Sequence, residues 1–146
     1  MDQSSPEPSK VFTVPEAEAA LPEVKALVEQ LQGLQRSILK TNTELDDTVA
    51  KISGGNGYPI RALKDEVQRL TKHQLQLIEA FQSSLSQLES LGVVLKDLSA
   101  GLVDFYARRD GTLVFLCWKL GEDRIGFWHG VEEGYGGRRP LDESSR

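Results

Sequence analysis

The sequence predicts an α+β fold, in which a long antiparallel helical hairpin is followed by a small three-stranded antiparallel β-meander. Apolar residues recur every three or four positions through residues 17–91, which is the period of a helix that faces one partner. A glycine-rich segment, SGGNG at residues 53–57, interrupts this pattern. After Gly92 the period falls to two, and Val, Ile, Phe, Tyr and Trp become frequent, as in strands.

We expect residues 12–146 to form a single domain after a short leader, residues 1–11, that is disordered. Residues 1–10 are rich in Ser, Pro and Glu, and they have too few bulky side chains to offset the entropy lost on ordering. The first helix is expected over residues 12–52, because Thr13 and Glu16 fit a capping box. Pro22 predicts a kink or a short break within it, since proline removes a backbone donor.

A loop over residues 53–59 then leads into a second helix at residues 60–91, with Gly92 as a left-handed cap. Both helices carry a narrow apolar seam of the coiled-coil type. Gln74 and Ser84 occupy seam positions, either as polar residues tolerated near water or as residues that select register or oligomer. Because each seam is too narrow to cover more than one neighbour, part of the hairpin is expected to remain in solvent. We therefore expect a homodimer through the helix seams, or else a hairpin capped at one end by the segment from Val93 onward.

The charge of the chain limits its partners. A formal net charge of −5 and a pI of about 5.1 argue against nucleic acid and against an anionic membrane surface as partners. No apolar run approaches the ~20 residues of a membrane helix. Cys117 is the only cysteine, so no disulfide can form within the chain. We therefore expect a cytoplasmic protein. Apart from a second copy of the chain, its expected partner is another protein.

The meander is expected over residues 92–130, with strands at residues 101–107, 112–119 and 124–129. Asp110 and Gly111 predict a type I′ turn, and Gly121 and Glu122 could form a second tight turn. Two such turns set the register, which places two rows on one mixed face: Asp104, Cys117 and Gly126, then Tyr106, Phe115 and Trp128.

The opposite face is then almost wholly apolar and is the one expected to pack on the helices. It carries Val103, Phe105, Ala107, Val114, Leu116, Trp118, Ile125 and Phe127. In this register His129 lies on the opposite face from Cys117. The mixed face is the most site-like surface that the sequence predicts.

Four stretches of the chain resemble one known family. They are FTVPEAEAALPEV at residues 12–24, LKDLSAGLVDF at 95–105, LCWKLGEDRIGFWH at 116–129 and GYGGRRP at 134–140. The family is an uncharacterised bacterial one, domain of unknown function 2203, and the resemblance covers nearly the whole chain. It implies no established activity and no catalytic residues.

Five residues are candidates for binding a ligand: Asp104, Cys117, Trp128, Arg138 and Arg139. The two arginines belong to a Gly/Arg-rich tail, residues 131–146, whose glycine-freed amides could join them in holding an anion. The alternative is that these arginines pair with a local carboxylate, from Glu132, Glu133 or Asp97.

Oxygen, sulfur and nitrogen donors for a divalent metal are offered by Asp104, Cys117, Glu122 and His129. The expected register speaks against a compact metal cluster, and the alternative is a structural thiol at Cys117 and a strand-ending histidine. A nucleophilic role for Cys117 is disfavoured, because a neighbouring carboxylate raises the pKa of a thiol.

The sequence therefore favours a non-enzymatic interaction or assembly module that acts as a homodimer, without a cofactor. The alternative is a small-ligand or metal-binding protein with its site on the C-terminal sheet, around Asp104 and Cys117. His73, on the second helix, receives no role.

Overall fold

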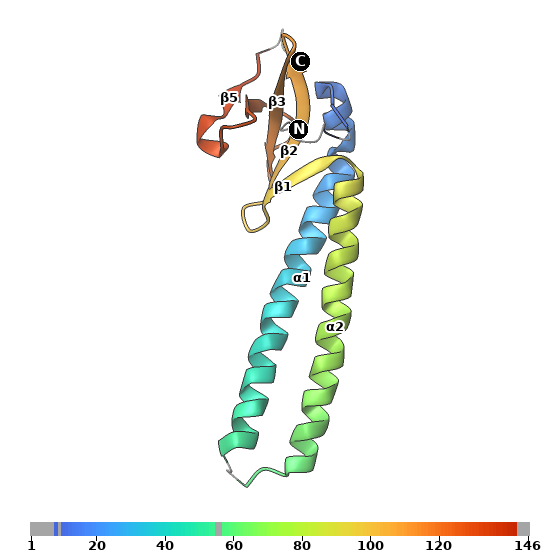
Figure 1. Cartoon of the computed structure of the whole chain (residues 1–146), viewed down its shortest axis with the longest axis vertical. Helices are drawn as coiled ribbons and strands as arrows, with labels where there is room; N and C mark the ends of the chain where they lie inside the picture. Colours follow the sequence, from blue (N-terminus) through green and yellow to red (C-terminus); the bar gives the residue numbers. More distant parts are fainter. Residues whose placement is uncertain (1–7, 9, 55–56, 143–146) are drawn as a thin grey trace, which may run out of the picture. The chain divides into compact units, whose positions relative to one another are not determined.

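The structure, a computed structural model, describes residues 8, 10–54 and 57–142 (Figure 1). The described residues divide into two compact units. One comprises the residues up to Glu29 and those from Ser86, and the other is Gln30–Leu85. Most of the expected leader lies outside the described residues, as do positions 55 and 56 of the loop and 143–146 of the tail.

The first helix, α1, is Val14–Gly54 and starts at the predicted capping box. The Thr13 amide donates to Glu16 Oε1 at 2.9 Å, and the Glu16 amide donates to Thr13 Oγ1 at 3.2 Å. The helix continues through Pro22, so the short break expected there does not occur. Proline removes only one donor, and the turns around it are held by buried side chains: Ala17, Leu21 and Val24.

The second helix, α2, is Ile60–Ser90 and runs antiparallel beside α1, which confirms the helical hairpin (Figure 1). Gly92, with φ of 89°, follows it in the left-handed conformation that its position predicted. The seam residue Gln74 is buried, and its Nε2 donates to the Ile38 carbonyl at 2.9 Å and to Asn42 Oδ1 at 2.6 Å. This polar seam position therefore joins the two helices of one chain.

An antiparallel sheet of five strands follows, in the order β1-β2-β3-β4-β5. Its strands are β1 (Val93–Asp97), β2 (Leu102–Arg109), β3 (Thr112–Lys119), β4 (Phe127–Gly130) and β5 (Arg139–Pro140). The prediction of three strands was wrong, because both edge strands were missed. A bulge interrupts β1 between Leu95 and Asp97, and β5 is two residues long, so neither shows a clear alternation.

One face of the sheet forms the core of its unit, and the predicted apolar residues of β2 and β3 are buried there: Val103, Phe105, Ala107, Val114, Leu116 and Trp118. The Phe12 ring meets the Phe105 ring edge-on, with 5.1 Å between centroids. The Phe12 amide donates to the Tyr106 carbonyl at 2.6 Å. The segment before α1 is thereby attached to β2.

The register between β2 and β3 is the predicted one. Asp104 lies opposite Cys117, and Arg109 lies opposite Thr112. The two residues between the strands both have positive φ, 52° at Asp110 and 79° at Gly111, as a type I′ turn requires. The hairpin signal in the sequence was therefore sufficient to align these two strands.

The register between β3 and β4 differs from the prediction by one residue. The structure pairs Cys117 with Phe127 and Phe115 with His129, whereas the expected register pairs them with Gly126 and Trp128. Because side chains alternate along a strand, a shift of one residue exchanges the two faces of β4. His129 therefore joins the face of Cys117, and Trp128 leaves it.

The cause is the connection between β3 and β4, residues 120–126, which is longer than a two-residue turn. The side-chain carboxylate of Glu122 accepts a hydrogen bond from the Lys119 amide at 2.8 Å. The backbone carbonyl of Glu122 accepts one from Trp118 Nε1 at 2.9 Å. Ile125 is fully buried within this connection, so it draws the chain toward the core. Strand β4 consequently begins at Phe127, later than predicted.

Candidate functional site

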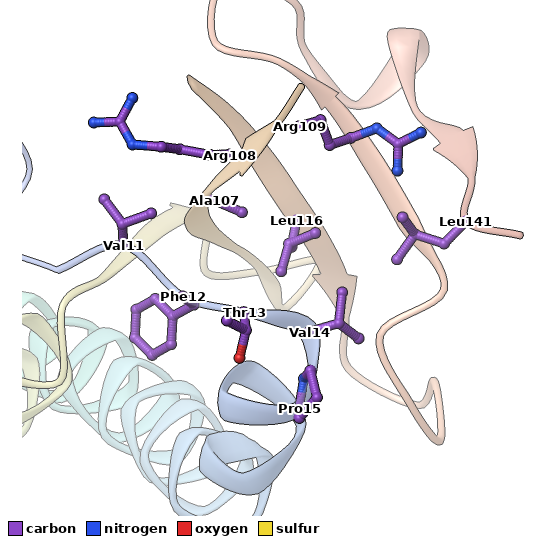
Figure 2. Close-up of a pocket in the computed structure, with 10 residues that line it drawn as sticks. All are labelled: Val11, Phe12, Thr13, Val14, Pro15, Ala107, Arg108, Arg109, Leu116 and Leu141. Carbon is purple, nitrogen blue, oxygen red and sulfur yellow. The ribbon is translucent and has the colours of Figure 1, made fainter. Parts of the chain in front are cut away.

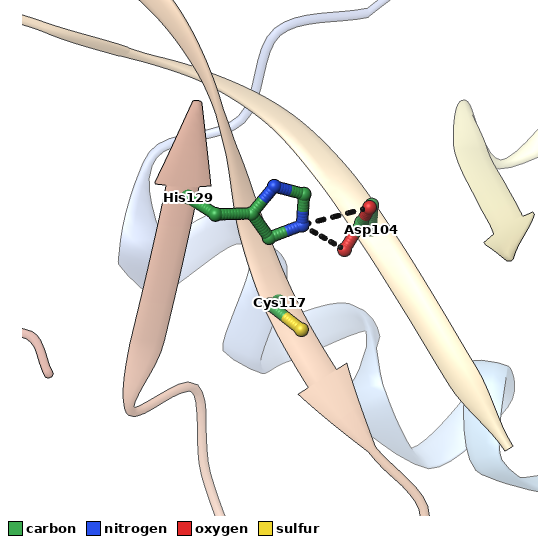
Figure 3. Close-up of side chains that lie close together, drawn as sticks. All are labelled: Asp104, Cys117 and His129. Atoms are coloured by element: carbon green, nitrogen blue, oxygen red, sulfur yellow. Dashed lines mark hydrogen bonds and ion pairs between the residues drawn. The ribbon is translucent and has the colours of Figure 1, made fainter. Parts of the chain in front are cut away.

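Asp104 of β2, Cys117 of β3 and His129 of β4 converge on one face of the sheet (Figure 3). Each residue is only 2% exposed. A donor atom from each, an oxygen, a sulfur and a nitrogen, lies within 4.8 Å of the other two. In the part of the chain that the structure describes, no other three His, Cys, Asp or Glu side chains form such a group. We call these three residues the Asp-Cys-His cluster.

His129 is held at both ring nitrogens. Nδ1 lies 2.8 Å from the Gly130 carbonyl oxygen, which can only accept, so Nδ1 carries a proton and donates it. Nε2 lies 3.2 Å from Oδ1 and 3.1 Å from Oδ2 of Asp104. Without a metal, a proton must lie between this nitrogen and the carboxyl group, because two lone pairs would repel each other there.

Burial controls the protonation of the two acidic members of the cluster. It raises the pKa of Asp104, and the opposing effects of His129, Lys96 and Cys117 are smaller. Burial, followed by the charge of Asp104, raises the pKa of the Cys117 thiol to about 11. The thiol is therefore protonated at neutral pH, and a cation beside it is needed before it can act as a thiolate.

A pocket of about 100 Å³ opens onto the cluster. Besides the cluster it is lined by Lys96, Leu102, Glu133, Gly134 and Tyr135. Glu133 holds the chain that follows β4 in place, since its Oε1 accepts from the Gly130 amide at 2.9 Å. A Cβ atom on Gly130 would lie 2.7 Å from that oxygen, so only glycine permits this approach.

Glu122, predicted as a fourth metal ligand, is not part of the cluster. Both of its carboxylate oxygens accept from Arg138 Nη2, each at 2.8 Å. The Arg138 guanidinium also lies 3.7 Å from the ring centre of Phe127 and 4.7 Å from that of Tyr135. The ion pair of Glu122 and Arg138 thus joins the segment between β3 and β4 to the tail, and each of the two charges is paired with the other.

Arg139 and Trp128 also lie apart from the cluster. Arg139 makes a forked ion pair with Glu133, in which each of two N···O distances is 3.0 Å. The Gly130 amide and then Arg139 hold the pKa of the Glu133 carboxyl below its ordinary value. The ring centre of Trp128 lies 4.5 Å from the Arg109 guanidinium and 4.8 Å from that of Arg139. The local pairing considered for the tail arginines is therefore present for Arg139, whereas Arg138 pairs with Glu122, a carboxylate that was not among those considered.

A second pocket, of about 290 Å³, lies between the segment before α1 and the β2–β3 hairpin (Figure 2). Its walls include the apolar side chains of Val11, Val14 and Leu141. Figure 2 shows Arg108 and Arg109 extending to opposite sides rather than converging on a common point. Specific ligand pockets have polar groups that converge, so this pocket is not the better candidate.

The sequence placed Asp104 beside Cys117 but separated both from His129. The missed signal is the pair of glycines, Gly121 and Gly126, which bound the β3–β4 connection at its two ends. Reading Gly126 as the end of a loop, rather than as a strand residue, would have ruled out the two-residue turn on which the expected register depended.

Residues 10–141 match the family described as "Uncharacterized conserved protein (DUF2203)". The matched range contains both helices, all five strands and the Asp-Cys-His cluster. No curated protein and no solved structure shows significant similarity to the chain. The match spans nearly the whole sequence and agrees with the resemblance of its motifs, so the chain belongs to the DUF2203 family of uncharacterized conserved proteins.

Proposed function

We propose that this protein binds one divalent transition-metal ion, with zinc as the preferred ion, through Asp104, Cys117 and His129. The observation that carries the proposal is the convergence of the three donor atoms, within 4.8 Å of one another, from three different strands. Carboxylate oxygen, thiolate sulfur and imidazole nitrogen are all zinc ligands. A set that includes sulfur and nitrogen favours zinc over magnesium or calcium, which prefer oxygen alone.

The spacing suits a tetrahedral ion. Zinc bonds these atoms at about 2.0–2.3 Å, so it would hold them roughly 3.3–3.8 Å apart. His129 Nε2 and Asp104 Oδ2 are already 3.1 Å apart, and the remaining adjustment is on the order of 1 Å. The Gly130 carbonyl, by taking the Nδ1 proton, directs Nε2 toward the ion, as backbone acceptors do behind many zinc-bound histidines.

The experiment is a zinc titration of chelator-stripped protein by calorimetry, checked by elemental analysis. We expect one equivalent of zinc in the natural sequence. Cys117→Ala and His129→Ala each lower the affinity at least about tenfold, because each removes a ligand. The controls are His73→Ala, which removes the other histidine of the chain, and Glu66→Gln, which alters a carboxylate of α2 in the other unit. Absence of zinc uptake, or an equal loss in the controls, contradicts the proposal.

A second candidate is an assembly role as a homodimer through the seams of the helical hairpin, in the manner of a coiled coil. It is supported by exposed apolar side chains in the unit Gln30–Leu85: Leu39, Val49, Tyr58, Ile60 and Leu75. Gln74 reaches the Ile38 carbonyl across the seam. Leu39 and Leu75 each come one residue after these two seam positions. In a pair of antiparallel helices, that step directs both side chains to the same side of the hairpin. Leu39 and Leu75, which are 60% and 56% exposed, therefore lie on one side. A second copy would cover them.

Light scattering tests this role. We expect a dimer for the natural sequence and a monomer when Leu39→Glu and Leu75→Glu are combined, because both charges would be buried in the interface. Val131→Glu, at an exposed apolar residue of the other unit, is the control and leaves the dimer intact. A natural sequence that stays monomeric at high micromolar concentration excludes the homodimer.

We further propose a cytoplasmic location, supported by the single cysteine, which is a buried free thiol. Across the described residues, no helix is both long enough and apolar enough to cross a membrane. The net charge of −5 supports a protein rather than a nucleic acid as any further partner.

A further inference from the structure

We infer that the metal site keeps a fourth coordination position for a small monoanion, held between the ion and the ammonium group of Lys96. The inference rests on the proposed zinc site and names the class of ligand that the site would take. What carries it is the pocket of about 100 Å³ that joins exposed Lys96 and Tyr135 to the three buried members of the cluster.

The pocket gives the ion access to solvent. Three protein ligands leave one position of a tetrahedral ion open, as in zinc sites that bind water or substrate. The cluster residues are 2% exposed, and this pocket opens onto them, so it gives a fourth ligand a route to the ion. Since a water molecule occupies about 30 Å³, the pocket holds roughly three waters, or an anion of four or five heavy atoms. Ions of the size of formate, acetate, bicarbonate or azide therefore fit the pocket.

Charge selects an anion rather than a neutral ligand. A divalent ion bound by the Asp104 carboxylate and the Cys117 thiolate leaves the centre neutral. Lys96 then adds one positive charge, and within the described residues it makes no ion pair. Glu133, the acidic residue that lines the pocket beside the cluster, is already paired with Arg139. One negative charge is therefore needed to balance the pocket.

Phe115 sets the position of Lys96 and also packs against the metal ligand His129. Its Nζ lies 4.5 Å from the ring centre of Phe115, and that ring lies 5.5 Å from the ring of His129. A cation–π contact of this kind holds a lysine that would otherwise point into solvent. Lys119 Nζ lies 5.7 Å from the ring centre of Tyr135 and adds to the positive field around the pocket. The arrangement favours a bound anion over a bound cation.

The test uses the full chain loaded with cobalt(II), whose visible spectrum reports both thiolate ligation and a change of fourth ligand. Sodium azide is the first probe and sodium acetate the second, so that a carboxylate is compared with an anion of another kind. We expect each anion to change the spectrum in a saturable manner. Lys96→Met weakens azide roughly tenfold, because the charge that faces the anion is lost. The matched control is Lys25→Met, at an exposed lysine of the same unit that lines a different pocket.

The outcomes separate this inference from the function on which it rests. If cobalt does not bind, both are overturned. If cobalt binds with a thiolate signature but neither anion alters the spectrum, the metal site stands and the anion position is wrong. Equal azide affinity in Lys96→Met and in the natural sequence means that azide binds any open cobalt position, which also overturns the inference.

Discussion

His129 Nε2 lies 3.1 Å from Asp104 Oδ2, although strand β3 separates the strands that carry these two residues. The contact is diagonal, since Asp104 lies opposite Cys117 while His129 lies opposite Phe115. Both side chains must point to the same face for this to occur. The pair therefore exists only in the observed β3–β4 register, and the Asp-Cys-His cluster depends on that register.

The buried pair predicts strong energetic coupling between its members in the metal-free protein. Asp104→Ala or His129→Ala alone leaves a buried polar partner without its hydrogen bond, at a cost of about 2–4 kcal/mol. The double variant removes both groups, so it should cost little more than one single variant. Urea unfolding of the four proteins gives a coupling of about 1–3 kcal/mol. Simple additivity of the two single losses would show that the contact carries no energy.

The raised pKa of Cys117 predicts a loss of stability in alkali. The thiol has a pKa of about 11 in the folded chain, against an ordinary value of 9.0. Between these values the unfolded chain has lost the proton that the folded chain keeps, so unfolding becomes easier as pH rises. The contribution of the protonated thiol to the free energy of unfolding is fully present below about pH 9. It falls by about 2 kcal/mol as the pH rises toward about 11.

Urea unfolding of metal-free protein at about pH 8 and about pH 10.5 measures this alkaline loss. Cys117→Ala has no thiol to ionise and should show a smaller difference between the two pH values. An identical alkaline loss in both proteins would assign it to other groups.

The Glu122–Arg138 pair is predicted to matter for stability far more than an exposed pair. Its side chains are 25% and 11% exposed, whereas those of Glu66 and Arg69 on α2 are 40% and 62% exposed. Glu122→Ala should cost about 2 kcal/mol, because it leaves a largely buried guanidinium without its carboxylate partner and frees the β3–β4 connection. Glu66→Ala should cost far less, because water screens an exposed pair. Equal losses in the free energy of unfolding would contradict the difference in burial.

Two neighbouring glycines of the tail should respond differently to alanine. A Cβ atom on Gly137 would lie 2.7 Å from Glu133 Oε2 and 3.0 Å from Glu133 Cβ, whereas one on Gly136 meets nothing within 4 Å. Gly137→Ala must displace Glu133, which holds Gly130 and Arg139, so we expect a loss of about 1–3 kcal/mol. Gly136→Ala should be neutral or slightly stabilising. Thermal unfolding of the two variants measures this difference. A larger loss of stability in Gly136→Ala than in Gly137→Ala would count against the packing of Glu133.

Removing the proposed metal should lower the melting temperature without unfolding the protein. The cluster side chains lie on a sheet with its own apolar core, and His129 is hydrogen-bonded without a metal. Zinc at a hundred times its Kd adds about 2.7 kcal/mol, which corresponds to a rise of roughly 5–10 °C for a chain of this size. Thermal scans with zinc and with chelator measure the shift, and far-ultraviolet circular dichroism at 25 °C should be unchanged. Collapse of the dichroism with chelator would indicate a structural metal site.

Much of the fold follows from local signals. Thr13 and Glu16 marked the start of α1, Gly92 marked the end of α2, and Asp110-Gly111 aligned β2 with β3. Each of these signals acts between residues close together in the chain, so it can be recognised without knowing the rest of the structure. The continuity of α1 through Pro22 could not be predicted in this way, since it depends on buried neighbours.

By itself, the sequence determined the helical hairpin, the change to a sheet after Gly92 and the pairing of Asp104 with Cys117. Only the tertiary structure decided that His129 joins them. The physical reason is that side chains alternate along a strand, so a shift of one residue changes the face on which each lies. That shift was set by the burial of Ile125 and the hydrogen bonds of Glu122 in the β3–β4 connection, which depend on the packed core.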